Sequence, residues 1–174
     1  IFNQPEYNEK ILKWLVDNGY DVGNHTQTHL DIKKSSGDRV QKEIAYVYDE
    51  LEKIIPGKYV KIIALPFGSP YVKTNENFKY VLSTNYDGKT YDTEAALRVG
   101  WEPEVSPYDK DFDPTFLKRC RAYDNNGKEF DINMVFTNLE NNRYVSDGNS
   151  DTIIAKSDKE SSINNNYDKK VITY

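Results

Sequence analysis

The fold of this chain is indicated by one stretch, Val60-Lys61-Ile62-Ile63-Ala64-Leu65-Pro66-Phe67-Gly68. Its first six residues are apolar except for Lys61, and such a run is typical of a strand that is buried on both faces. Proline cannot donate a hydrogen bond to a neighbouring strand, so Pro66 ends the run. The stretch therefore predicts a buried parallel strand over residues 60–65, followed directly by a turn.

Two helical patterns precede this strand in the sequence. Apolar residues recur at helical spacing from Val40 to Ile54, which predicts a helix that begins near Ser36 and stops at Pro56-Gly57. An earlier helix is predicted over residues 5–18, with Trp14 on its buried stripe, and a short strand over 20–23. Helices that alternate with strands are typical of a parallel α/β fold.

Weaker patterns continue the alternation, and residues 101–114 are expected to form a long loop. Residues 1–156 are expected to form one domain, followed by a polar C-terminal tail at 157–174 whose last residues could pair as a strand. The remaining expected elements are helices at 75–83 and 132–139 and strands at 95–100, 118–123, 143–146 and 152–155.

Composition excludes several classes of protein. The chain has 174 residues, of which 37% are hydrophobic and 29% charged, so it is expected to be globular and to contain no transmembrane segment. A net charge of −5 argues against nucleic-acid binding. The single cysteine, Cys120, excludes a disulfide within the chain and is expected to be a small buried residue.

The chain has only two histidines, His25 and His29, and they follow the predicted strand at 20–23. Two imidazoles four residues apart face the same way if the segment turns helically, so both can bind one divalent ion. Imidazole suits zinc, with cobalt or nickel as alternatives. A zinc site needs a third protein ligand, and a chance pair of surface histidines is the competing interpretation.

Two motifs give the chain a specific resemblance. Residues 25–29, His-Thr-Gln-Thr-His, resemble the second motif of the polysaccharide deacetylases (carbohydrate esterase family 4, the NodB-homology domain), which reads H-[ST]-x-x-H. Leu65-Pro66-Phe67-Gly68 resembles the end of the third motif, R-x-P-[YF]-G. The similarity extends from there through residues 95–100 and 106–114 to about residue 148.

The resemblance implies a distorted (β/α) barrel that acts as a metal-dependent hydrolase on carbon–nitrogen amide bonds. Such an enzyme removes N-acetyl groups from a polysaccharide, either chitin-like or peptidoglycan. It also implies that His25 and His29 bind the metal and that the backbone N–H of Phe67 stabilises the oxyanion. Pro66, Gly68, Tyr71 and Trp101, with Phe67 and Tyr108, are the expected lining of a sugar groove. A bacterial protein at the cell wall or outside the cell would fit this substrate.

The chain also departs from the family pattern. It contains no Asp-Asp pair, which the first motif, T-F-D-D-G, would supply, and that motif is expected upstream of Ile1 together with the N-terminal barrel strand. The arginine of the third motif falls on Ala64, and no histidine remains for the late acid. We therefore expect impaired activity in this chain. The alternative is a catalytically inactive carbohydrate-binding or cell-envelope module, and an exposed barrel edge would favour a homodimer.

Overall fold

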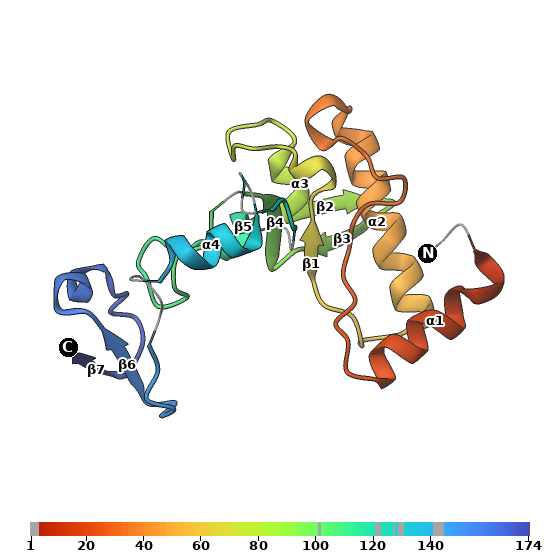
Figure 1. Ribbon diagram of the computed structural model, residues 1–174. Coiled ribbons are helices and arrows are strands. Elements are labelled where there is room, and N and C mark those ends of the chain that lie inside the picture. Colours follow the sequence, from red (N-terminus) through yellow and green to blue (C-terminus); the bar gives the residue numbers. More distant parts are fainter. Residues whose placement is uncertain (1–3, 101, 121–122, 127, 129–130, 141–144) are drawn as a thin grey trace. The chain divides into compact units, whose positions relative to one another are not determined.

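The computed structural model describes residues 4–100, 102–120, 123–126, 128, 131–140 and 145–174. The chain forms two compact units, residues 1–100 with 114–118, and residues 101–113 with 119–174. Its elements, drawn in Figure 1, are α1 (Pro5–Asp17), η1 (Ile32–Lys34), α2 (Gly37–Ile54), β1 (Ile62–Ala64), η2 (Pro66–Gly68), α3 (Phe78–Leu82), β2 (Ser83–Tyr86), β3 (Lys89–Asp92), β4 (Ala95–Val99), η3 (Pro114–Phe116), β5 (Leu117–Arg119), α4 (Ile132–Asn138), β6 (Thr152–Ala155), η4 (Ser157–Ser162) and β7 (Lys170–Thr173).

The first unit is organised around a three-stranded sheet with the order β1-β4-β5. β1 and β4 run parallel, with Ile63 opposite Ala96, and α2 covers the face on which both of these side chains are buried. Val40 and Ile44 of α2 pack there with Ile63 and Leu65, which confirms the buried strand and the core face of the long helix. This packing fixes the C-terminal end of β1, where the turn at 66–68 begins.

Residues 22–24 lie beside β1 but make only one bridge, between Asn24 and Ile63. The N–H of Asn24 donates to Ile62 O (2.8 Å), and the N–H of Ala64 donates to Asn24 O (2.9 Å). The predicted strand at 20–23 is therefore wrong: these residues form no strand, and only the isolated bridge at Asn24 pairs, in the parallel sense, with β1. Because Asn24 pairs with β1, the next residue, His25, leaves the sheet beside the end of β1.

Helix α1 shows that the prediction for Trp14 was wrong. Leu12 and Asn8 are the buried residues of α1, whereas Trp14 is 56% exposed and its ring stacks on Tyr20 at 5.9 Å. Trp14 is two residues from Leu12, so it points to a different side of the helix. Amphipathic spacing identified the helix correctly, but an apolar residue at the edge of the stripe was assigned to the core.

The segment after α3 differs from the predicted helix at 75–83. The helix covers only Phe78–Leu82, and the chain then forms the β2–β3 hairpin, with Thr84 opposite Tyr91. Asp87 and Gly88 both have positive φ, 49° and 73°, as a two-residue hairpin turn requires. The Asp-Gly pair between β-prone residues was the signal that the sequence prediction missed.

The second unit holds α4 and a parallel pair of strands, β6 and β7, with Ile153 opposite Val171. The predicted strand at 152–155 is confirmed, and the C-terminal residues pair with it. Helix α4 begins where Asp131 accepts a hydrogen bond from the N–H of Asn133 (2.7 Å), so a normal N-cap defines it. Cys120 is half-buried. Of the predicted strand at 143–146, residues 143 and 144 lie outside the described residues, and 145–146 form no strand.

The α/β class is confirmed, and the described strands form small sheets, none of which closes on itself. The barrel therefore stays a prediction from the resemblance. Within the described residues, no helix has both the length and the apolar character needed to cross a membrane.

Candidate functional site

The two histidines lie on a loop whose backbone is held in an unusual conformation. Thr26 and His29 have φ values of 61° and 60°, the left-handed region that non-glycine residues rarely adopt. The segment does not make the helical turn that the four-residue spacing suggested. Two left-handed residues bring His25 and His29 to the same side instead.

The imidazole rings of His25 and His29 lie edge to face, with their centroids 4.9 Å apart. Nδ1 of His25 is 2.5 Å from the carbonyl oxygen of Ala64. Because a carbonyl only accepts, Nδ1 carries the hydrogen in the neutral ring and Nε2 keeps its lone pair for a ligand. A backbone carbonyl that fixes the tautomer in this way is a common partner of a metal-binding histidine.

Two adjacent residues of α2, Glu43 and Ile44, hold the loop through hydrogen bonds. Asn24, which is buried, donates from Nδ2 to Ile44 O (3.0 Å) and accepts at Oδ1 from the N–H of Thr26 (2.9 Å). Glu43 precedes Ile44 on α2, and its carboxylate accepts from the N–H and from Oγ1 of Thr28, both at 2.7 Å. These supporting residues were missed from sequence. The available signal was Glu43, a charged residue on the otherwise apolar face of α2.

The turn at 66–68 follows β1 and lies against His29. The Phe67 and His29 ring centroids are 4.5 Å apart, and Phe67 is 56% exposed while Pro66 and Gly68 are buried. Phe67 has a φ of 56°, and its N–H donates to no acceptor among the described residues. Gly68 lies so close to β4 that an added Cβ would meet Val99 at 2.4 Å.

The expected sugar-groove residues are only partly brought together. Tyr71 is 50% exposed, and its hydroxyl donates to Phe67 O (3.0 Å), so it lies next to the turn. Trp101 lies outside the described residues. Tyr108 belongs to the second unit, so only Pro66–Gly68 and Tyr71 are shown near the histidines.

The two histidines supply part of the ligand set that a metal site needs. Two imidazoles fit as two ligands, but the described residues contain no cluster of three His, Cys, Asp or Glu side chains. Asp31, the nearest acid in sequence, accepts from Ser69 Oγ (2.8 Å) and pairs with Lys34 (3.1 Å). Partial burial acts to raise the pKa of Asp31, but the Ser69 hydrogen bond and the Lys34 ammonium outweigh it and hold that pKa below its ordinary value.

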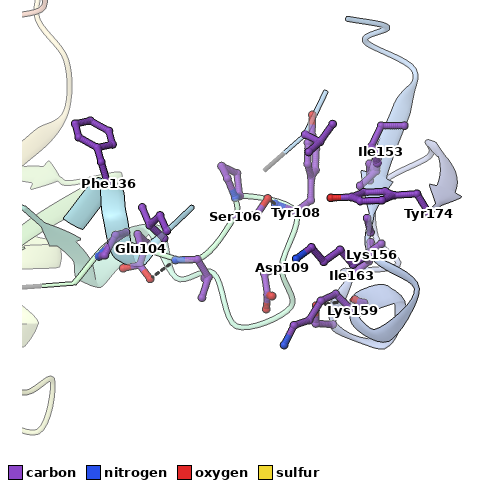
Figure 2. Close-up of a pocket in the computed structure, with 18 residues that line it drawn as sticks. Glu104, Ser106, Tyr108, Asp109, Phe136, Ile153, Lys156, Lys159, Ile163 and Tyr174 are labelled. Carbon is purple, nitrogen blue, oxygen red and sulfur yellow. Dashed lines mark hydrogen bonds between the residues drawn. The ribbon is translucent and has the colours of Figure 1, made fainter. Parts of the chain in front are cut away.

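A large cavity of about 1060 Å³ lies elsewhere, lined only by residues of the second unit. Figure 2 shows Tyr108, Phe136, Ile153 and Tyr174 around it, with Lys156 and Lys159 on the side of η4. Its lining contains neither histidine nor cysteine, and its walls are mainly apolar. The candidate metal ligands are therefore those of the first unit, on the exposed loop at 25–29.

Comparison with known proteins agrees with the two motifs. Residues 2–86 match the family model for polysaccharide deacetylase, a span that contains the loop at 25–29, β1 and the turn at 66–68. No curated protein and no solved structure gives a significant match. As the resemblance predicted, residues 2–86 of this chain are similar to the polysaccharide deacetylase family.

Proposed function

We propose that this protein removes N-acetyl groups from a polysaccharide, either chitin-like or peptidoglycan, with His25 and His29 as two ligands of a divalent metal. The observation that carries the proposal is the pair of imidazoles 4.9 Å apart, with the Nε2 of His25 left available by the Ala64 hydrogen bond. Zinc is the expected ion, and cobalt or nickel would suit the same donors.

The reaction is hydrolysis of an acetamide. Water adds to the carbonyl carbon, the carbon–nitrogen bond breaks, and the products are acetate and a protonated amine on the sugar. When bound, a divalent ion supplies Lewis acidity for this step. The N–H of Phe67, which is free of acceptors among the described residues, is suited to donate to the carbonyl oxygen as negative charge develops there.

The exposed side chains of Phe67 and Tyr71 supply an apolar surface next to the histidines on which a sugar ring can lie. Pro66 and Gly68 are buried beneath it and keep the turn in place. This arrangement supports a saccharide rather than a small polar substrate, because aromatic faces give large contact area at low entropic cost.

The test compares three proteins: the wild type, the double variant His25→Ala/His29→Ala, and the matched control Gln27→Ala, which changes an exposed residue between the histidines. Zinc binding is measured by calorimetry, and acetate release is measured with N-acetylglucosamine oligomers. We expect the double variant alone to lose metal binding and any acetate release. Identical metal binding by all three proteins would refute the proposed site.

A second candidate function is a carbohydrate-binding module without catalysis. It is favoured by Ala64, which stands where the family has arginine, and by the two-residue rather than three-residue cluster among the described ligands. A glycan affinity that survives chelation of metal, with no acetate release at any metal concentration, would favour this function over hydrolysis.

The proposed substrate also suggests where the protein acts and how it assembles. Cell-wall polysaccharides lie outside the cell membrane, so we propose an extracellular or cell-envelope location. A homodimer is proposed because an open sheet edge invites pairing with another chain. Sedimentation velocity at several protein concentrations would show the dimer, or would rule it out if the chain stays monomeric throughout.

A further inference from the structure

Glu43 is a buried carboxylate whose hydrogen bonds go to a single residue of the histidine loop. It lies on α2 and is 5% exposed, and its two oxygens accept from the N–H and the hydroxyl of Thr28 at 2.7 Å each. Among the described residues, the cation that pairs with Glu43 is Arg39, whose Nε lies 4.0 Å away and whose side chain is mostly exposed. A buried carboxylate is unfavourable unless hydrogen bonds satisfy it, and Thr28 supplies both of them.

Thr28 directly precedes His29, whose backbone is left-handed with φ at 60°. The residue that follows His29 is held as well, because the N–H of Leu30 donates to Thr26 Oγ1 (2.9 Å). The backbone of His29 is therefore fixed on both sides. Of these two contacts, the one between Leu30 and Thr26 lies within the loop. Only the contact between Thr28 and Glu43 comes from another element of the fold, helix α2.

The two histidines are oriented by different means. The ring of His25 is fixed directly, through Nδ1 and the carbonyl of Ala64. The ring of His29 has no hydrogen-bond partner among the described residues, and it makes edge-to-face contacts with the rings of His25 and Phe67. Its direction consequently depends on where its backbone lies, and the hydrogen bonds of Thr28 to Glu43 determine that position.

We propose that Glu43 is a positioning residue for His29: through Thr28 it holds the second imidazole beside the first, so that both would be available to hold one divalent ion. The part of this proposal that concerns metal rests on the proposed function, whereas the part that concerns ring geometry does not. The role requires an acceptor with two free oxygens. Glutamine keeps the shape and one acceptor oxygen, but it replaces the other with a donor that cannot accept from Thr28.

The experiment compares Glu43→Gln with the control Glu50→Gln, the same chemical change at a half-buried glutamate on the same helix that pairs with Lys53. Thr28→Val removes the hydroxyl hydrogen bond from the other side while keeping the side-chain shape. Two readouts are needed: the nuclear Overhauser effect between the His25 and His29 rings in the metal-free protein, and the Kd for Zn²⁺ by calorimetry. Thermal unfolding confirms that each variant is folded.

We expect Glu43→Gln and Thr28→Val to weaken the ring-to-ring effect and to raise the Zn²⁺ Kd about 10-fold or more, the size of change seen when a residue supporting a ligand is lost. Glu50→Gln should stay within about twofold of wild type. An unchanged ring-to-ring effect in folded Glu43→Gln would overturn the proposal. If the wild type binds no Zn²⁺, the proposed function fails, but the ring comparison still decides the role of Glu43. If Glu43→Gln does not fold, Thr28→Val is judged by the same criteria.

Discussion

Replacing Gly68 by alanine should test how the turn at 66–68 is fixed to the sheet. Gly68 has a φ of +69°, and a Cβ built there would lie 2.4 Å from Val99 Cβ and 2.6 Å from Val99 N. The second of these atoms is backbone of β4, so no rotation of a side chain can relieve the contact. Gly68→Ala therefore combines two costs, an unfavourable backbone conformation and a steric clash.

The two costs can be separated with a matched control. Gly57 has nearly the same φ, +66°, but an added Cβ there meets nothing within 4 Å. Gly57→Ala should therefore lose only the conformational part, about 1–2 kcal/mol for a left-handed L-residue. Gly68→Ala should lose this and a further ~1–3 kcal/mol for overpacking against β4, about 2–5 kcal/mol in all.

The measurement is the free energy of unfolding from urea titration, followed by far-ultraviolet circular dichroism. Comparable m-values in the three proteins would show that the change lies in the folded state. Equal losses in Gly68→Ala and Gly57→Ala, within about 0.5 kcal/mol, would refute the close approach of the turn to Val99. The larger loss at Gly68 would instead show that β4 fixes the backbone from which Phe67 is presented.

Two further predictions concern stability. Leu12→Ala, at a fully buried position, should lower the free energy of unfolding by about 2–5 kcal/mol in the same urea assay. Trp14→Ala should lower it by about 1 kcal/mol or less, because that side chain is 56% exposed. Comparable losses in the two variants would contradict the observed orientation of α1. Folding lowers the pKa of Asp31, so the stabilising effect of its carboxylate is fully present above the ordinary pKa of 3.8 and is lost as the pH falls through the lower folded value. Asp31→Asn should therefore show a smaller drop in unfolding free energy than wild type on acidification below pH 3.8, and a parallel drop in both proteins would assign the effect to other groups.

Much of the first unit could be predicted from sequence, because its elements follow from local pattern. The apolar run at 60–65 and the helical spacing from Val40 to Leu51 both describe faces that are buried in the structure. The β2–β3 hairpin was missed for the opposite reason. Residues 75–83 carry enough helical character to extend a helix, but the Asp-Gly turn and pairing with β3 convert residues 83–86 to strand.

The sequence indicated His25 and His29 as candidate site residues, but it did not predict their geometry. Spacing alone suggested a helical turn for His25 and His29, whereas the structure uses left-handed residues to bring the rings together. Backbone conformations of this kind are unfavourable locally, so no local propensity predicts them. They persist only where tertiary hydrogen bonds hold them, and those partners, Asn24 and Glu43, come from packing against α2.

The left-handed residues at the site also link its stability to its function. Thr26, His29 and Phe67 are three of the five non-glycine residues with positive φ in the described chain, and two of them have rings in contact. Each costs roughly 1–2 kcal/mol relative to an ordinary conformation, so the surrounding structure holds this region against its own preference. A ligand that binds both imidazoles at once binds the folded arrangement more tightly than the unfolded chain. Its binding free energy would therefore offset that cost, by an amount that grows with ligand concentration relative to Kd. Loss of a supporting hydrogen bond should consequently reduce metal affinity more than it reduces global stability, because the strained loop relaxes while the core of α2 and β1 stays packed.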